Sequence, residues 1–252
     1  MIKSKVTNTH RYKLQTAMLE KRRRSFLYFK DKIIVPSAHG NKRMEQVEAE
    51  FQRECFEAMA PSLDALRLGS LPPIRRFWLE RTKGASKDTD IAIVLTWLVI
   101  FSDRSLYGQV GAADRDQAGI VKRRAEQLLE ANPWMQDHIQ IVNNEIRSRE
   151  TQTKIDILAA DVTGGSHGET PDILILNELS HVQRWKSIED LMSNADKMPR
   201  GIVIAATNAG FTGTETEKWR KIAQASSGVR FARCSKCRKE VKLTKAGRFT
   251  KH

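Results

Sequence analysis

A polar segment centred on Lys87 has the residue types of a phosphate-binding site. The segment, ERTKGASKDTDIA at residues 80–92, places Gly84 three residues before the lysine. It lies between an expected strand and an expected helix, and the first turn of a helix favours anions through its free N–H groups and its dipole. The segment therefore predicts a phosphate site at Lys87. The other interpretation is an ordinary helix start, capped by Ser86 or Asp88.

Three substitutions separate this segment from the usual phosphate-loop pattern, G-x-x-x-x-G-K-[ST]. Arg81 stands at the first glycine and Ser86 at the second. Asp88 replaces the Ser or Thr that would hold Mg²⁺, and Thr89 follows as a substitute ligand. The pattern alone leaves both interpretations open.

A second candidate is the stretch DILILNE at residues 172–178. In ATPases with a phosphate loop, a buried strand ends in two acidic residues, of which the first holds Mg²⁺ through water and the second polarises the attacking water. Glu178 suits the second role, and Asn177 suits the first only in part because an amide is a neutral ligand. The alternative is a central strand followed by an acidic loop residue.

A third candidate is the stretch GIVIAATNAG at residues 201–210, an apolar run that ends in Thr207 and Asn208. In motor ATPases a short polar motif at such a strand end senses the γ-phosphate, whereas the alternative is a strand followed by a turn. The carboxyl ends of parallel strands meet in one crevice, where open α/β sheets bind ligands. We therefore expect the three candidates to lie together.

The surrounding pattern predicts the elements that position these residues. An amphipathic helix is expected at 43–59, ended by Pro61, after a loop at 36–42. From residue 74 onward, apolar strands alternate with helices, which predicts a parallel sheet covered by helices on both faces. The expected strands are 74–80, 106–113, 139–143, 153–160, 171–178 and 201–208. The expected helices are 88–101, 114–131, 185–195 and 213–226.

Composition favours a globular protein with a polyanionic partner. The chain has 252 residues, 40% hydrophobic and 29% charged, with a formal net charge of +13. No apolar run reaches the roughly 20 residues needed to span a bilayer, so we expect no membrane partner. Three cysteines and no visible secretory signal favour the reducing cytoplasm.

The positive charge is concentrated near residue 252. Residues 230–252 hold nine Lys or Arg and one Glu. They suggest contacts with DNA phosphates, whereas the plainer interpretation is a solvated surface tail. The candidate DNA-binding residues are Arg233, Lys236, Arg238 and Lys239. Cys234 and Cys237 have the spacing of half a zinc site, and no second pair follows them.

In order and content, the three candidates resemble the ATPase domain of the phage large terminase subunit, the motor that packages DNA into capsids. The resemblance runs from about Phe51 to Asn208. It treats the Lys87 segment as a deviant Walker A motif. It also includes GAADRDQAG at 111–119, DVTGGSHGETPDILILNELSHV at 161–182 and ATNAG at 206–210.

The resemblance implies a P-loop NTPase fold of the RecA-like (ASCE) class, with ATP and Mg²⁺ as cofactors. It implies ATP contacts from Arg81, Gly84, Ser86, Lys87 and Thr89. It places the metal, partly through water, near Asp88, Thr89 and Asn177. Glu178 would be the catalytic carboxylate, and Arg81 would sense the γ-phosphate or assist hydrolysis. Thr207 and Asn208 would couple hydrolysis to movement.

The expected organisation is an N-terminal basic and helical extension at 1–70, an ATPase domain at 71–228 and a basic tail at 229–252. The implied partners are double-stranded DNA, a portal protein, a small terminase subunit and further copies in a ring, all in the host cytoplasm. A complete large terminase also carries a nuclease domain, and we assign no nuclease activity to this chain. The alternative function is a non-catalytic remnant that binds nucleotide and DNA.

Overall fold

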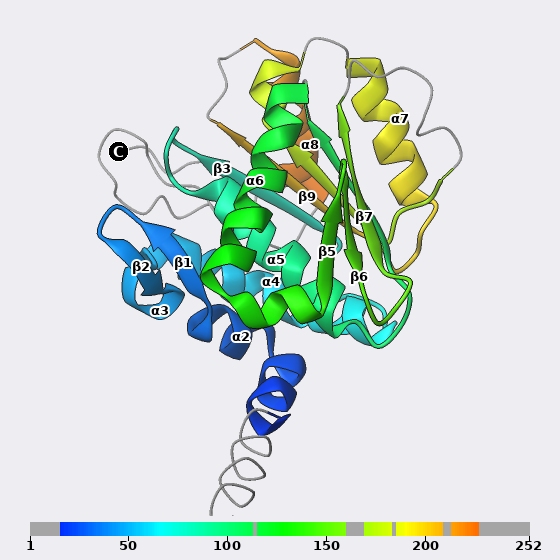
Figure 1. The fold of residues 1–252 in the computed structure, drawn as a ribbon. Helices are drawn as coiled ribbons and strands as arrows, with labels where there is room; N and C mark the ends of the chain where they lie inside the picture. The colour runs from blue at the N-terminus through cyan, green and yellow to red at the C-terminus, as the bar shows by residue number, and fades with distance from the viewer. Residues whose placement is uncertain (1–15, 113–114, 160–168, 183–184, 209–212, 227–252) are drawn as a thin grey trace, which may run out of the picture.

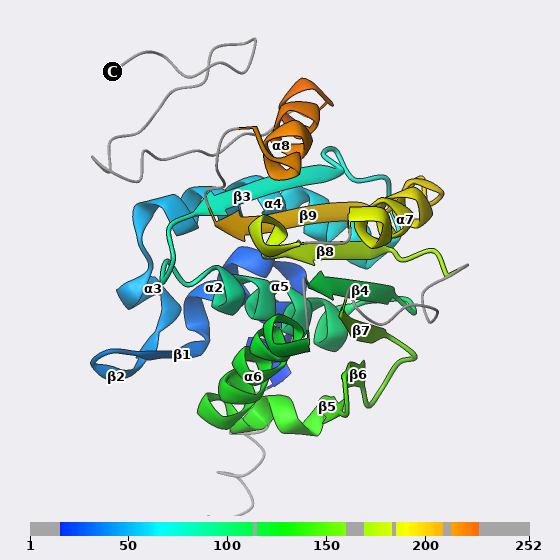
Figure 2. The same cartoon turned by 90° about the horizontal axis from the view of Figure 1, so that it is seen from above.

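The computed structural model describes residues 16–112, 115–159, 169–182, 185–208 and 213–226. Within these ranges, a seven-stranded sheet has the order β3-β9-β8-β4-β7-β6-β5 (Figures 1 and 2). The strands β3, β9, β8, β4 and β7 are parallel, and β6 and β5 are antiparallel additions. The strands are β3 Arg76–Arg81, β4 Tyr107–Ala112, β5 Ile139–Val142, β6 Glu145–Ser148, β7 Lys154–Ala159, β8 Ile173–Asn177 and β9 Ile202–Asn208.

Helices cover both faces of this sheet. One face carries α4 (Glu50–Leu68), α5 (Lys87–Phe101) and α6 (Arg115–Ala131), and the other carries α7 (Trp185–Asp196) and α8 (Glu215–Ser226) (Figure 2). Short 3-10 turns η1 (Pro133–Asp137) and η2 (Leu179–His181) complete this part of the chain. The mostly parallel sheet with helices on both faces confirms the P-loop NTPase-like fold expected from the sequence.

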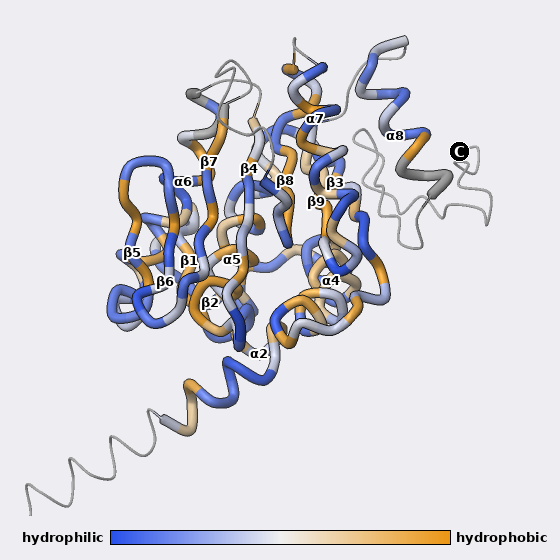
Figure 3. The backbone as a smooth tube through the Cα atoms, turned by 90° about the vertical axis from the view of Figure 1, so that its right-hand side faces the viewer, coloured by the Kyte–Doolittle hydropathy of each residue, from blue (hydrophilic) through white to orange (hydrophobic). Residues whose placement is uncertain are grey.

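Alternating residues of the central strands fill two separate cores. Ile173 and Ile175 of β8 join the cluster under α4, α5 and α6, while Leu174 and Leu176 join the cluster under α7. The alternation follows from the two-residue period of a strand. Because both of its faces are buried, β8 is apolar from Ile173 to Leu176. Figure 3 shows hydrophobic stretches, in orange, among the strands at the centre of the molecule.

The segment before the sheet contains more structure than the sequence suggested. Helix α2 (Phe26–Lys32) is followed by a hairpin of β1 (Ile34–Ser37) and β2 (Gly40–Arg43), where a loop at 36–42 was predicted. The Ser37 hydroxyl donates to the Gly40 carbonyl at 2.6 Å and fixes the turn. Pro36 is tolerated because β1 and β2 form only a two-stranded sheet, which leaves each strand an unpaired edge.

The helix predicted at 43–59 was also wrong at both ends. The structure has a short α3 (Met44–Val47), a break, and then α4, which passes through Pro61 and ends at the left-handed Gly69. A proline inside a helix costs about 3 kcal/mol. Beyond it, Leu63 and Leu66 are fully buried, and each contributes about 1.5–3 kcal/mol. The burial therefore offsets the proline, and the helix continues.

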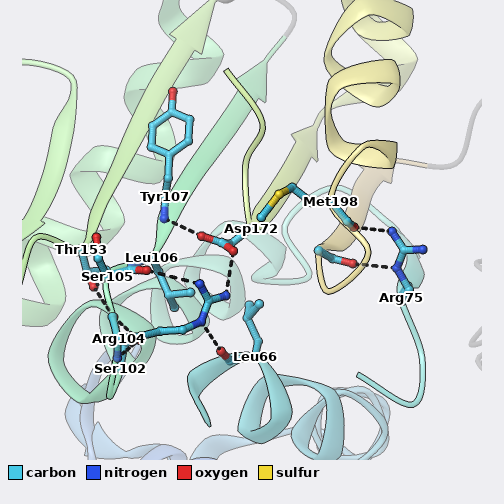
Figure 4. Close-up of polar contacts among 11 residues, drawn as sticks. Leu66, Arg75, Ser102, Arg104, Ser105, Leu106, Tyr107, Thr153, Asp172 and Met198 are labelled. Atoms are coloured by element: carbon cyan, nitrogen blue, oxygen red, sulfur yellow. Dashed lines mark hydrogen bonds and ion pairs between the residues drawn. The ribbon is translucent and has the colours of Figure 1, made fainter. Parts of the chain in front are cut away.

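At the sheet edge where β4 and β8 begin, Asp172 holds several elements together (Figure 4). Its carboxylate accepts from the Arg104 guanidinium at 2.7 Å and from the Tyr107 backbone N–H at 2.9 Å. Arg104 also donates to the Leu66 carbonyl at the end of α4. Nearby, Arg75 donates to the Met198 carbonyl at 2.7 Å. These bonds fix the strand starts, far from the strand ends considered below.

Replacing Asp172 with alanine is therefore expected to lower the free energy of unfolding by about 1–3 kcal/mol, because Arg104 and the Tyr107 N–H lose a buried acceptor. Urea denaturation measures the change. The matched control is Asp196→Ala, which removes a half-exposed carboxylate paired with Arg76 at the surface. Equal losses in the two variants would contradict a structural role for Asp172.

Candidate functional site at the strand ends

Three strands end level with one another at one edge of the sheet. In the parallel register, Arg81 at the end of β3 is opposite Asn208 of β9, and Asn177 at the end of β8 is opposite Ala206 of β9. Helix α5 begins at Lys87, directly after the loop 82–86 that follows β3. The three stretches predicted to share a crevice are thus brought to the same edge.

The two residues predicted to bind phosphate and to activate water are in direct contact. The Lys87 ammonium forms an ion pair with Oε1 of Glu178, and both residues are buried, with 6% and 7% of their surface exposed. The other carboxylate oxygen of Glu178 is buried and has no hydrogen-bond partner among the described residues. A lysine and a carboxylate are thus held together, with one oxygen left to accept a further donor.

The two unusual positions of the motifs also meet. The Asn177 amide donates to Oδ1 of Asp88 at 2.8 Å, which ties the end of β8 to the first turn of α5. The other carboxylate oxygen of Asp88 lies 3.6 Å from the Lys87 ammonium. The site therefore contains two carboxylates, one amide and one ammonium within a single connected cluster.

The loop before α5 has left-handed backbone at the position where the phosphate-loop pattern has its second glycine. Ser86 occupies that position with φ 57° and ψ 19°, a left-handed conformation that favours glycine, and Gly84 has φ 82°. Ser86 is the N-cap residue of α5, but its side chain makes no capping hydrogen bond. Of the alternative drawn from the sequence, a helix start with Ser86 or Asp88 as the N-cap, the structure has Ser86 at that position but without a side-chain hydrogen bond.

Replacing Ser86 with glycine is expected to raise the free energy of unfolding by about 0.5–1 kcal/mol. The left-handed conformation costs an L-residue about 1–2 kcal/mol, which glycine would not incur. Glycine also makes the unfolded chain more flexible, and this offsets part of the gain in stability. The matched control is Ser86→Ala, which keeps the Cβ and should give no gain. Chemical denaturation measures the free energy of unfolding of both variants. An equal gain in stability in Ser86→Ala would contradict the backbone strain at this position.

Glu178 shares this backbone strain. Its φ of 58° is left-handed, and its N–H donates to the Ala206 carbonyl of β9 at 2.8 Å. Such conformations cost about 1–3 kcal/mol and are kept mainly where the surroundings fix them, often at functional sites. The left-handed conformation of Glu178 turns the chain sharply after β8 and directs the Glu178 carboxylate toward Lys87.

Thr207 connects the end of β9 to the segment that follows Glu178. Its hydroxyl accepts from the Ser180 backbone N–H at 3.0 Å and donates to the Asn208 carbonyl at 3.1 Å. Thr207 is fully buried. The predicted coupling residue Thr207 is thus hydrogen-bonded to Ser180, which follows the predicted catalytic residue Glu178 by two positions.

Arg81 makes contacts that the sequence did not suggest. Its guanidinium pairs with the carboxylate of Asp90 in α5, which also accepts from Gln52 of α4 at 2.8 Å. The guanidinium also lies 5.0 Å from the centre of the Phe51 ring. The sequence signal for this pair is Asp90, which directly precedes the apolar run of α5. A buried carboxylate needs a cationic or hydrogen-bonding partner.

The electrostatics of this pair follow from burial and charge. Burial has the largest single effect on the pKa of Arg81 and lowers it, but the influences of Asp90 and Cys55 together outweigh burial and raise the pKa above its ordinary value. Burial also raises the pKa of the Cys55 thiol. Arg81 therefore stays charged, and its guanidinium contacts Asp90 of α5 and Phe51 of α4 in this structure.

Several predicted residues lie outside the described ranges. They are the basic-tail residues Arg233, Lys236, Arg238 and Lys239, together with Cys234 and Cys237. Segment 161–168 of the terminase-like stretch also lies outside them. Across the described ranges there is no group of three or more His, Cys, Asp or Glu side chains arranged to hold a metal. In that same part of the chain, none of the helices is long and apolar enough to cross a bilayer.

The fold is an α/β domain with a P-loop NTPase-like sheet. Among solved structures, the large terminase of bacteriophage HK97 is similar to this chain with a TM-score of 0.62 and 17% identity, over 79% of this chain and 40% of that one. The chain thus spans less than half of that protein. The likeness to phage large terminases expected from the sequence is confirmed at the level of the fold.

Two weaker similarities involve the same class of protein. The ATPase domain of the Thermus phage P74-26 large terminase matches with a TM-score of 0.44 and 17% identity, over 59% of this chain and 70% of that one. The large terminase of another thermophilic bacteriophage, in complex with ADP, matches with a TM-score of 0.43 and 10% identity, over 72% and 50%. No family model and no curated protein sequence matches the chain.

Proposed function

We propose that this chain is the ATPase domain of a phage large terminase, which couples ATP hydrolysis to the movement of double-stranded DNA into a procapsid. The observation that carries the proposal is the buried contact between Lys87 and Glu178, which come from two different strand ends. A phosphate-binding ammonium and a general base must both lie next to the terminal phosphate of ATP. The terminase-like fold supports the same conclusion.

The contacts of the site suggest how its residues act. ATP phosphates would replace Glu178 as the ion-pair partner of the Lys87 ammonium, because they are more highly charged. The released carboxylate can then accept a proton from the attacking water. The left-handed residues Ser86 and Gly84 turn the chain into α5, and the first N–H groups of that helix would face the phosphates.

The buried polar atoms of the site fit a divalent cation. Oδ1 of Asn177 and Oε2 of Glu178 are buried without partners among the described residues, and hard cations prefer oxygen ligands. Asp88, Thr89 and Asn177 are the residues that would hold Mg²⁺. When bound, Mg²⁺ would neutralise charge on the β- and γ-phosphates.

Thr207 is proposed to transmit the state of the site. Its hydroxyl accepts a hydrogen bond from the Ser180 N–H. A movement of Glu178 toward the attacking water would therefore be transmitted through Ser180 to the end of β9. Asn208 follows at the strand end, and its buried Oδ1 has no partner among the described residues. These contacts support the proposal that Thr207 and Asn208 couple hydrolysis to motion.

The proposed partners follow from the terminase-like fold and the charge of the chain. Double-stranded DNA would be gripped by basic residues, including those of 229–252. A portal protein, a small terminase subunit and further copies in a ring complete the proposed assembly, in the host cytoplasm. The division into 1–70, 71–228 and 229–252 remains a prediction.

The deciding experiment measures phosphate release with and without duplex DNA. We expect ATP hydrolysis that DNA stimulates, and DNA affinity that falls with salt at a log–log slope of about −0.9 per phosphate contacted. Nucleotide binding without any turnover would favour the alternative, a remnant that binds nucleotide and DNA. A protein that binds neither would contradict both functions.

A further inference from the structure

Two departures from the usual motifs occur at residues that touch each other. Asp88 stands where a phosphate loop has Ser or Thr, and Asn177 stands where the acidic strand has its first carboxylate. Each looks like a defect when taken alone. In the structure they are joined by the hydrogen bond from the Asn177 amide to Asp88 at 2.8 Å.

The pair keeps the charge of the usual arrangement. A hydroxyl on the loop and a carboxylate on the strand carry one negative charge between them. Asp88 on the loop and Asn177 on the strand also carry one, with the positions reversed. Two unrelated losses would have no reason to balance in charge.

We propose that the two metal ligands have exchanged places in this chain, so that Asp88 supplies the anionic oxygen for the divalent cation and Asn177 supplies the neutral one. The inference rests on the proposed nucleotide function. It concerns the ligand chemistry within that site: one carboxylate and one amide oxygen for a hard cation that also binds phosphates.

The orientation of Asn177 provides an independent observation. Its amide nitrogen must face the Asp88 carboxylate, because two oxygens cannot share that hydrogen bond. The amide oxygen is then the atom left for another partner. The residue is fully buried, and this oxygen has no hydrogen-bond partner among the described residues. A buried acceptor without a donor is costly, and a cation would satisfy it.

Asp88 is placed so that a ligand can reach it. Its side chain is 19% exposed, whereas the Lys87 side chain is 7% exposed. Its second carboxylate oxygen lies 3.6 Å from the Lys87 ammonium, where the phosphates are expected. Without a cation this carboxylate would repel a triphosphate. Nucleotide binding in this chain should therefore depend more strongly on the cation than it does with a hydroxyl at this position.

The test is a charge-swap experiment that does not need turnover. Mn²⁺ binding is followed by its electron paramagnetic resonance signal in the presence of a non-hydrolysable ATP analogue, for the wild type, Asp88→Ser, and the double variant Asp88→Ser with Asn177→Asp. Asp88→Ser is expected to weaken Mn²⁺ binding at least about tenfold, since even outer ligands contribute about 10–100-fold. The double variant should recover most of the lost affinity, because it restores a carboxylate to the pair.

A second readout uses the analogue alone. In the absence of any divalent cation, Asp88→Ser should bind a fluorescent ATP analogue more tightly than the wild type, because a negative charge beside the phosphates is gone. Asp196→Ser, which removes a carboxylate at the other end of the sheet, is the matched control and should change neither measurement.

The outcomes separate this inference from the proposed function. Unchanged Mn²⁺ affinity in Asp88→Ser would overturn the exchange. So would a folded double variant that fails to recover, with folding checked by thermal denaturation. In both cases a wild type that still binds and hydrolyses ATP leaves the proposed function standing. A wild type that binds neither the analogue nor Mn²⁺ overturns both.

Discussion

Replacing Glu178 with glutamine is expected to reduce ATP turnover by at least about a hundredfold while nucleotide binding survives. General-base catalysis typically contributes about 10²–10⁴-fold, and an amide cannot accept the proton of the attacking water. Glutamine also cannot form the ion pair with Lys87. Because that pair competes with phosphate for the ammonium, the variant should bind nucleotide as tightly as the wild type or somewhat more tightly.

Two measurements separate these effects. Steady-state phosphate release reports turnover, and titration with a fluorescent nucleotide reports binding. The matched control is Glu145→Gln in β6, a carboxylate on the far side of the sheet that pairs with Arg147. Normal turnover in Glu178→Gln would remove Glu178 from the catalytic role. Loss of nucleotide binding together with a lower melting temperature would show that the residue mainly holds the fold.

The fold could be predicted from the sequence where apolar runs are long and regularly interrupted. The strands that became β3, β4, β7, β8 and β9 were expected within one or two residues of their observed ends. Strand β6 was missed because EIRS has a single buried apolar side chain, Ile146, and its pairing with β7 supplies the rest. Its antiparallel direction could not be derived from a pattern that predicts parallel strands.

The candidate site was predictable in outline and not in its pairings. Lys87 and Glu178 were expected to meet because both follow strands that end at one edge. The hydrogen bond between Asp88 and Asn177 was not, since a sequence pattern brings residues to one site without specifying which side chains bond to each other. The partner of Arg81 was also missed, because long-range contacts between α4, β3 and α5 depend on how the helices pack rather than on sequence spacing.

The buried pair of Arg81 and Asp90 leads to the second large effect. Asp90 has 1% of its surface exposed and Arg81 has 8%, so neither charge can be solvated if the other is removed. Breaking a buried ion pair by removing one partner costs about 3–5 kcal/mol. Asp90→Asn is therefore expected to lower the free energy of unfolding by that amount, measured by urea denaturation.

A surface pair on the same strand provides the matched control. Arg76 of β3 pairs with Asp196, and their side chains are 33% and 49% exposed. Asp196→Asn should cost no more than about 1 kcal/mol, since exposed ion pairs contribute little. Equal losses in Asp90→Asn and Asp196→Asn would contradict the structural importance of the buried pair.

The same pair decides between two roles for Arg81. If Arg81 mainly anchors the start of α5, the double variant Arg81→Met with Asp90→Leu should be more stable than the two single losses together predict, because no buried charge is left alone. The double variant should then still bind nucleotide through Lys87. If Arg81 instead contacts the γ-phosphate, as the terminase resemblance implies, turnover in the double variant should fall while its stability is recovered. Denaturation and phosphate release on one set of variants thus separate an anchoring arginine from a catalytic one, and a residue with both roles would show both losses.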